Sequence, residues 1–290
     1  MRRLLPCLAL AACVPPGNST PSDSGAPATS STSQATPTRP SANVLTTVFE
    51  DNFDRPKVTP AATAPTLAIA PSVLLGDAAA AKTDAAGEAA VAIVPMPSAA
   101  VALPADDLGP NWHQAQTSAW HIENGRLCGQ NAKNHGVWLQ KVLPVNARIE
   151  FDAVGDSTDV DLKSEVWGDG QSAATGQSYT NATSYLTIFG GWHNKYHVLA
   201  RINEHGTDRK EIEIDPKSDD PRERPAVKGQ QYHFKIERTD GKTVRWFVDG
   251  LEWLKFADAE PLAGFGHDHF GFNDWEVKVC FDNVRVTPLP

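Results

Sequence analysis

The segment from Asp159 to Trp167 has side-chain types and a spacing that could support chemistry. It reads Asp-Val-Asp-Leu-Lys-Ser-Glu-Val-Trp, so charged and apolar residues largely alternate. Successive side chains of a β-strand point to opposite faces. Asp161, Lys163 and Glu165 would therefore share one face with Asp159 and Trp167, the two ends of the segment. Two carboxyl groups about 5–5.5 Å apart can cleave a glycosidic bond, one as nucleophile and one as acid. Asp161 and Glu165 are therefore the candidate catalytic residues.

Lys163 lies between these two carboxylates in the alternation. A neighbouring ammonium lowers the pKa of a carboxyl group, whereas a general acid needs a raised pKa. The segment thus has three interpretations: a ligand groove lined by carboxylates, a solvated sheet face held by weak ion pairs, or a hydrolytic pair. The lysine makes the hydrolytic pair the least favoured of the three, so no catalytic residue is assigned.

Three tryptophans lie among polar and glycine neighbours, which favours exposure: Trp167, Trp192 and Trp275. Aromatic faces bind the apolar faces of sugars, with a few polar groups for the hydroxyls. Trp112, Trp120, Trp138 and Trp246 lie instead in alternating apolar patterns and are predicted to be core residues. The sequence therefore predicts carbohydrate as the partner and the following ligand-binding set: Asp161, Lys163, Glu165, Trp167, Trp192 and Trp275.

Charge and motifs exclude several other functions. The formal net charge is −9, and no stripe of lysine and arginine interrupts the acidic balance, so we expect no nucleic-acid partner. The sequence contains no phosphate loop, dinucleotide fingerprint, nucleophile elbow or His-Glu-x-x-His motif. We therefore expect no organic cofactor and no zinc centre, and we expect a monomer.

The distribution of aromatic residues defines the folded domain. No aromatic residue precedes Phe49, none occurs from Val58 to Asp107, and all eight tryptophans lie between Trp112 and Trp275. We predict a domain over residues 44–290, interrupted by a low-complexity Ala/Pro-rich insert at about 58–107. Short alternating segments and tight Gly turns predict an all-β fold, an antiparallel two-sheet β-sandwich. The predicted strands begin near residue 49 and continue over 120–123, 126–130, 137–142, 147–155, 160–168, 184–190, 195–203, 209–214, 231–238, 243–248, 252–256, 269–273 and 276–287.

The N-terminus has the features of a secretion signal. A positive start is followed by a short apolar run, too short to span a membrane, which predicts a signal peptide over residues 1–12. The sequence Leu10-Ala11-Ala12-Cys13 resembles the lipobox of bacterial lipoproteins, which implies cleavage before Cys13 and lipidation of its sulfur. We expect anchoring in the cell envelope, and in the outer membrane because residue 14 is Val rather than Asp. The alternative is an ordinary cleaved signal peptide.

Residues 13–43, rich in Ser, Thr and Pro, are predicted to be a disordered tether.

Several motifs together resemble the concanavalin A-like lectin and glucanase superfamily, which includes laminin-G-like domains. They are, in order, Phe49 to Phe53, Trp120 to Leu127, Tyr232 to Arg238 before Trp246 to Gly250, and the terminal Phe281 to Val286. The resemblance implies a jelly-roll sandwich in which the strand near Phe49 lies beside the last strand. It also implies a structural calcium ion with Glu50 and Asp282 as oxygen donors. The alternative for Asp282 is a local capping role.

Cys128 and Cys280 lie in strand-like segments 152 residues apart. In an oxidising compartment they could form a disulfide, and the alternative is two buried free thiols.

Three functions remain open for the domain. The first is a lectin-like protein that binds carbohydrate without cleaving it. The second is a glycan-cleaving enzyme, similar to glycoside hydrolases or to keto-disaccharide hydrolases, that uses Asp161 and Glu165. The third is a structural or adhesion module.

Overall fold

The computed structural model of the chain describes residues 44–55, 108–114 and 119–290. The predicted signal peptide, Cys13, the tether and the Ala/Pro-rich insert lie outside these residues. Within the described part of the chain, no helix is long and apolar enough to cross a membrane.

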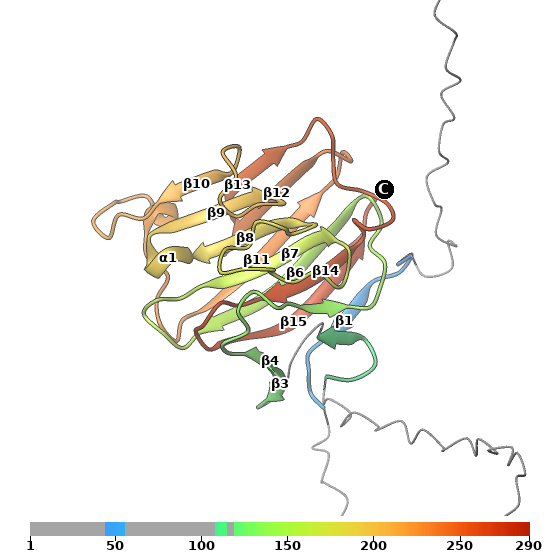
Figure 1. Cartoon of the computed structure of the whole chain (residues 1–290), viewed down its shortest axis with the longest axis horizontal. Helices are drawn as coiled ribbons and strands as arrows, with labels where there is room; N and C mark the ends of the chain where they lie inside the picture. Colours follow the sequence, from blue (N-terminus) through green and yellow to red (C-terminus); the bar gives the residue numbers. More distant parts are fainter. Residues whose placement is uncertain (1–43, 56–107, 115–118) are drawn as a thin grey trace, which may run out of the picture. The chain divides into compact units, whose positions relative to one another are not determined.

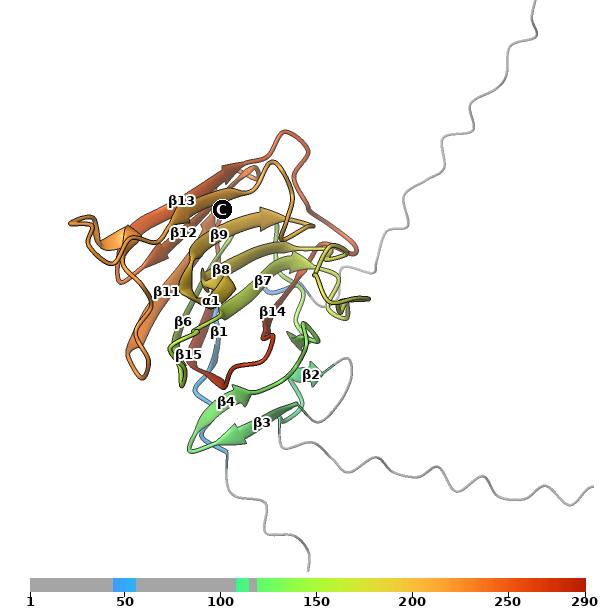
Figure 2. The ribbon, with the colours of Figure 1, turned by 60° about the vertical axis from the view of Figure 1, so that its left-hand side comes forward.

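Two antiparallel sheets pack against each other, so the predicted β-sandwich is confirmed (Figures 1 and 2). The eight-stranded sheet has the order β13 (Leu251–Ala257), β12 (Thr243–Val248), β11 (Gln231–Arg238), β6 (Ala147–Gly155), β15 (Val279–Pro288), β4 (Arg126–Gly129) and β3 (Trp120–Glu123), and β1 (Phe49–Asp51) also pairs with β15. The seven-stranded sheet has the order β10 (Lys210–Glu213), β9 (Tyr196–Arg201), β8 (Tyr185–Gly190), β7 (Leu162–Gly168), β14 (His269–Asn273), β5 (Val137–Leu139) and β2 (Trp112–Gln114). Two short helical turns, α1 (Gly191–Asn194) and a 3₁₀ turn (Pro221–Glu223), complete the described elements.

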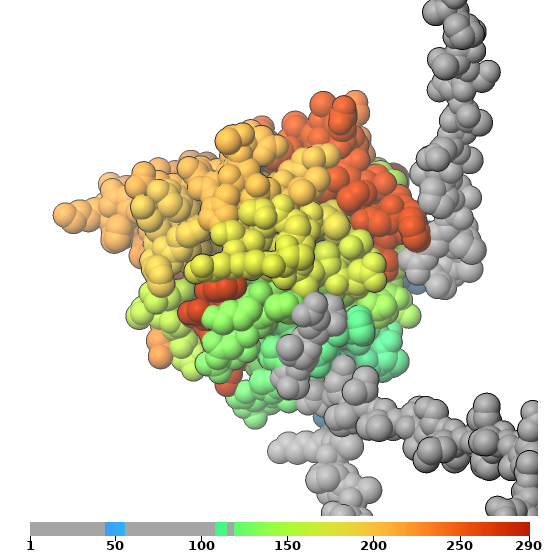
Figure 3. Space-filling model, viewed as in Figure 1, coloured from blue at the N-terminus to red at the C-terminus, as the bar shows by residue number. Residues whose placement is uncertain are grey.

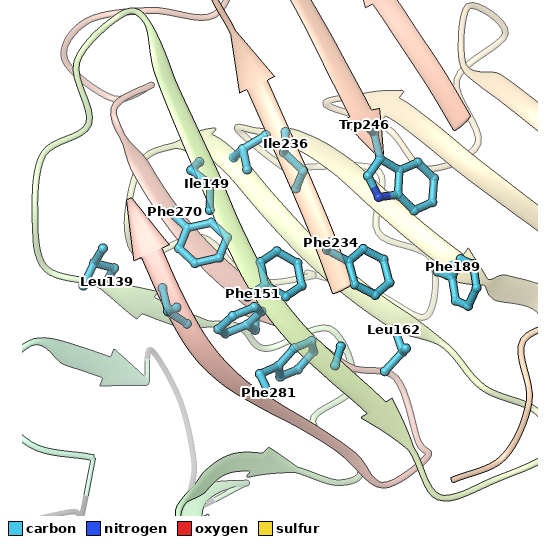
Figure 4. Packing of buried hydrophobic residues seen from close by; sticks show 14 of the residues in the cluster. Leu139, Ile149, Phe151, Leu162, Phe189, Phe234, Ile236, Trp246, Phe270 and Phe281 are labelled. Carbon is cyan, nitrogen blue, oxygen red and sulfur yellow. The ribbon is translucent and has the colours of Figure 1, made fainter. Parts of the chain in front are cut away.

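The core forms between the two sheets because each strand turns alternate residues inward. Strand β6 buries every second residue along its length, and Phe151 on β6 stacks on Phe234 of β11 with centroids 5.1 Å apart. Figure 4 shows these rings beside Phe270 and Phe281 in the same cluster. The four tryptophans predicted as core are confirmed, since all are at most 4% exposed: Trp112, Trp120, Trp138 and Trp246.

Strand β1 joins the rest of the domain through β15, as the resemblance implied. Phe49 lies opposite Val286 in the ladder. The carboxylate of Asp51 then accepts hydrogen bonds from both Nη atoms of Arg55, at 2.8 and 2.6 Å, and from Nε1 of Trp112 at 2.9 Å. The hydrogen bond from Trp112 to Asp51, together with that from Arg55 to the carbonyl of Leu108 at 3.3 Å, connects the residues on the two sides of the insert.

Strands β4 and β15 place Cys128 directly opposite Cys280, with their Cα atoms 4.1 Å apart. The structure joins the two residues in a disulfide. The bond links two strands of one sheet that are 152 residues apart in the sequence.

Candidate functional site

A pocket of about 310 Å³ lies on the outer face of the seven-stranded sheet. Its wall combines aromatic, charged and amide side chains: Asn134, Asp159, Asp161, Lys163, Gln177, Ser178, Trp192, His193, Glu204, His205, Trp275, Glu276 and Val277. They come from the ends of β7, β8, β9 and β14 and from loops that pack beside them. Figure 3 shows this side of the molecule, where the red β14–β15 segment emerges between green and yellow segments. The volume is at the lower end of the range, about 300–1,000 Å³, for small-molecule sites.

Strand β7 places Lys163 at the base of the pocket. Lys163 lies opposite Ile188 of β8 and Asn273 of β14, whereas its neighbour Leu162 faces the core. Its ammonium lies 3.2 Å from Oδ2 of Asp161. It also contacts Oδ1 of Asn134 at 3.1 Å and Oε2 of Glu204 at 3.5 Å.

The charges around Lys163 keep it protonated. Lys163 is 6% exposed, and burial alone would lower its pKa. The negative charges of Asp161 and Glu204 outweigh that effect and leave the pKa of Lys163 above its ordinary value. The base of the pocket is therefore a fixed ionic cluster.

Glu165 shares the outer face with Lys163 but does not line the pocket. It is 0% exposed. Its two oxygens accept hydrogen bonds from Ser184 Oγ at 2.6 Å, Asn273 Nδ2 at 2.6 Å and the Tyr179 hydroxyl at 3.1 Å. Burial raises the pKa of Glu165 to about 7, against the opposing effect of these hydrogen bonds. This carboxyl group is enclosed below the pocket.

Trp167 points away from the outer face, so its predicted exposure and its place in a ligand surface are wrong. The register of β7 against β14 shifts between His269 and Phe270, and Trp167 has a φ of 54°. A bulge inserts a residue and reverses the alternation of the side chains. The ring of Trp167 is 0% exposed, and Arg238 lies 3.9 Å from its centroid.

The turn after β8 presents Trp192 to the pocket. Trp192, His193 and Asn194 all have left-handed backbone angles, with φ between 53° and 60°. Such angles are costly for residues other than glycine, and consecutive examples need support from outside the turn. Asn194 supplies it, because its amide group donates to the carbonyl of Ala226 at 2.6 Å and accepts from the N–H of the same residue at 2.9 Å.

Trp275 reaches the pocket from the segment between β14 and β15. It is partly buried, and the ammonium of Lys133 lies 4.5 Å from its ring centroid. Lys133 also forms an ion pair with Glu276. The preceding residue, Asp274, is 0% exposed, and burial raises its pKa to about 7.

The structure therefore brings four of the six sequence-predicted ligand residues to one pocket, namely Asp161, Lys163, Trp192 and Trp275. Glu204 also contacts the central lysine and was not among the residues predicted from the sequence. Glu204 follows β9 in an irregular turn, where no periodic pattern marks its orientation. Tertiary contact alone brings it to Lys163.

The predicted calcium ligands each have a cationic neighbour. Glu50 forms an ion pair with Arg285, its partner across the β1–β15 ladder. Asp282 lies 3.8 Å from Arg126 and accepts a hydrogen bond from the N–H of Asn283 at 2.7 Å. Among the described residues, no group of three or more acidic, histidine or cysteine side chains has the arrangement of a metal site. The calcium ion stays a prediction.

Neither a protein-family model nor a curated protein sequence matches the chain. Among solved structures, the carbohydrate-binding module CBM66 from Bacillus subtilis is similar at 14% identity and a TM-score of 0.45, over 61% of this chain and 95% of the module. A β-glucanase from Bacillus licheniformis is similar at 11% identity and a TM-score of 0.43, over 61% of this chain and 91% of the enzyme. The galectin LEC-6 from Caenorhabditis elegans is similar at 11% identity and a TM-score of 0.34, over 61% of this chain and 96% of the galectin. Similarities at these TM-scores do not identify a ligand or an activity for this chain.

Proposed function

We propose that the domain binds carbohydrate in this pocket without cleaving it. The observation that carries the proposal is that two partly buried tryptophans, Trp192 and Trp275, line the same pocket as several hydrogen-bonding side chains. An aromatic ring offers a face for the C–H groups of a sugar, and carboxylate and amide groups accept or donate hydrogen bonds to its hydroxyls.

The surroundings of Glu165 argue against hydrolysis by the pair that the sequence suggested. A general acid or nucleophile must reach the bond that is cleaved. Glu165 is 0% exposed, and three neighbouring side chains donate to its oxygens. Asp161 lines the pocket, but its carboxylate is paired with Lys163 at 3.2 Å. A binding role requires neither group to move.

A glycan array tests this proposal on the unlipidated mature chain, residues 13–290 with Cys13→Ser. For any glycan that binds, we expect Trp192→Ala and Trp275→Ala each to weaken affinity at least about tenfold, because each loses a stacking face. Phe265→Ala is the matched control, since Phe265 is 61% exposed and does not line the pocket. Binding to no glycan, or binding that both tryptophan variants retain, would overturn the proposal. Release of reducing ends from a bound glycan would overturn its non-catalytic part.

We also propose that Cys13 anchors the mature chain in the outer membrane through lipid. The support is the sequence Leu10-Ala11-Ala12-Cys13 after a short apolar run. Several acyl chains on one residue hold a protein stably in a membrane. Incorporation of a labelled fatty acid should be lost in Cys13→Ser and retained in Cys7→Ser, and the labelled protein should fractionate with the outer membrane. Equal labelling of both variants would contradict the assignment of Cys13.

A further inference from the structure

The pocket has more negative than positive groups, and this excess bears on the charge of its ligand. Four carboxylates line it, from Asp159, Asp161, Glu204 and Glu276, and Lys163 is the one lysine or arginine of its wall. Two further cations lie over its tryptophans: Lys133, which pairs with Glu276, and Arg209, which pairs with Glu211. With Glu211 included, five carboxylates face three cations. The two histidines of the wall lie beside carboxylates, since His193 is 3.1 Å from Asp159 and His205 is 3.5 Å from Glu204. The net potential at the pocket is therefore negative and attracts a cationic ligand.

Lys163 does not compensate for this imbalance. An ammonium group has three N–H donors, and three acceptors surround that of Lys163: Asp161, Asn134 and Glu204, at 3.1–3.5 Å. A ligand carboxylate could bind Lys163 only by displacing one of them. The pocket thus lacks a free cation for an acidic sugar among the residues that line it.

One carboxylate oxygen of Asp161 is an acceptor that receives no hydrogen bond from the described residues. Its Oδ2 atom pairs with Lys163, whereas no side-chain or backbone donor in the described part of the chain reaches Oδ1. The residue is 9% exposed and lines the pocket. A carboxylate oxygen that has lost most of its water and has no protein donor favours a ligand that can donate to it.

The side of the pocket near Trp275 already holds an ammonium group from the protein. Nζ of Lys133 lies over the Trp275 ring, 4.5 Å from its centroid, and pairs with Glu276. An aromatic face next to a carboxylate is an arrangement that attracts a cation. The side chain of Lys133 is 44% exposed, so a ligand ammonium can take its place more easily than a ligand carboxylate can displace a partner of the buried Lys163.

We infer that the pocket selects glycans that carry a free ammonium group, that is, amino sugars, over neutral sugars and over uronic acids. This inference rests on the proposed carbohydrate-binding function and deepens it. The ammonium of the sugar donates to Oδ1 of Asp161 or replaces Lys133 between Trp275 and Glu276. The sugar ring stacks on a tryptophan face.

Calorimetric titration with three tetrasaccharides tests the inference on the unlipidated mature chain. The probes are a glucosamine tetramer, the N-acetylglucosamine tetramer of the same linkage, and tetragalacturonate, in a buffer in which the free amines are protonated. We expect the glucosamine tetramer to bind about tenfold more tightly than the acetylated one, and tetragalacturonate to bind most weakly. Raised salt should reduce the preference, because it screens the charges at the mouth of the pocket.

Two variants separate a charge effect from a folding defect. Asp161→Asn and Glu276→Gln keep side-chain size, and each should lower the preference for glucosamine over N-acetylglucosamine at least about threefold. Glu276 has a side chain that is 53% exposed, so its variant should fold normally. Asp219→Asn is the matched control with the same change of net charge, on an exposed residue outside the pocket.

The outcomes distinguish this inference from the proposed function. If the chain binds no glycan of the array or of the three probes, the proposed function fails. If a neutral sugar or tetragalacturonate binds as tightly as the glucosamine tetramer, the function stands and the selection for amino sugars is overturned. A preference that survives in both Asp161→Asn and Glu276→Gln also overturns it.

Discussion

The hydroxyl of Tyr179 donates a hydrogen bond of 3.1 Å to the buried carboxyl group of Glu165. The backbone N–H of the same tyrosine donates to Oε1 of Glu204 at 2.8 Å. Tyr179 thereby ties the loop between β7 and β8 to the sheet below it and to the ionic cluster of the pocket. Gln177 and Ser178, which line the pocket, immediately precede it.

Tyr179→Phe should therefore weaken both folding and binding. The variant loses the hydrogen bond to the buried Glu165 and a longer one, of 3.3 Å, with Oγ of Ser172, and we expect the free energy of unfolding to fall by about 1–2 kcal/mol. Affinity for a bound glycan should fall severalfold, because the loop that carries Gln177 and Ser178 is less constrained. Urea unfolding and calorimetric titration measure the two effects.

Tyr232→Phe is the matched control for this variant. The Tyr232 hydroxyl accepts a hydrogen bond from the N–H of Val227 at 2.8 Å, away from the pocket. It should lower stability by a similar amount and leave affinity unchanged. Equal loss of affinity in both variants would show that general destabilisation, and not the tie to Glu165, governs binding.

Glu165 should make the stability of the protein depend on pH. Its pKa is about 7 in the folded protein against an ordinary value of 4.5, so the folded state binds a proton that the unfolded state has released between these pH values. The stability it contributes is fully present below about pH 4.5 and is lost as the pH rises through about 7, by about 3 kcal/mol in total. Glu165→Gln, which cannot titrate, should lack this loss.

The measurement is the difference in the free energy of unfolding between the wild type and Glu165→Gln at each pH. Taking the difference cancels the titration of other buried groups, such as Asp274 and His197, whose folded pKa values are shifted to about 7 and to about 4. Glu213→Gln, on an exposed residue of β10, is the control with the same substitution. A difference for Glu165→Gln that does not change with pH would contradict the raised pKa.

The insert should be dispensable for folding and binding. Nη2 of Arg55 lies 3.3 Å from the carbonyl oxygen of Leu108, so the described residues on the two sides of the insert are close together. About six Gly/Ser residues span about 20 Å and should replace residues 58–107 without strain. The shorter loop should raise the free energy of unfolding by about 1–2 kcal/mol in urea experiments.

Arg55→Ala tests the side chain that joins the two segments, since it removes both the contact with Leu108 and the ion pair with Asp51. Asp51 is 8% exposed, and removal of its partner leaves a buried carboxylate uncompensated. We expect a loss of about 3 kcal/mol in the same urea experiments. If the chain with the short linker no longer unfolds cooperatively, the insert is needed for folding. If the Arg55→Ala variant is as stable as the wild type, the contacts of Arg55 do not hold the two segments together.

Removal of the disulfide should lower stability strongly. The bond closes a segment of 152 residues, and the chain-entropy model gives a loss of about 3–5 kcal/mol for Cys128→Ala with Cys280→Ala. The melting temperature should fall by about 10 °C. A reducing agent should lower the melting temperature of the wild type and leave the double variant unchanged. A wild type that is insensitive to reduction in denaturant would contradict a bonded pair.

The sequence determined the sandwich because the evidence for it is local. Alternation along residues 147–155 and 231–238 predicts strands with these bounds, and the structure has both. Buried tryptophans were predictable from their apolar neighbours in the same way. The short strand β2, Trp112–Gln114, was not among the predicted strands, although Trp112 was correctly predicted to be buried.

The site was predictable only where side-chain alternation held. Lys163 in β7 and Asp161 just before it follow the alternation of the strand, and both line the pocket. The same reasoning failed at Trp167, because a bulge against β14 reversed the alternation. It also could not separate Lys163, at the pocket, from Glu165, enclosed beneath it, because the difference comes from Tyr179, Ser184 and Asn273 on other segments.

The sequence by itself thus determined the fold class, the strands and which face of β7 is charged, since each depends on residues that are neighbours in the chain. The tertiary structure decided which of those charges a ligand can reach. It brought Glu204 to Lys163 across 41 residues and turned Trp167 into the core. Access and pairing depend on packing between distant segments, and local periodicity does not encode that packing.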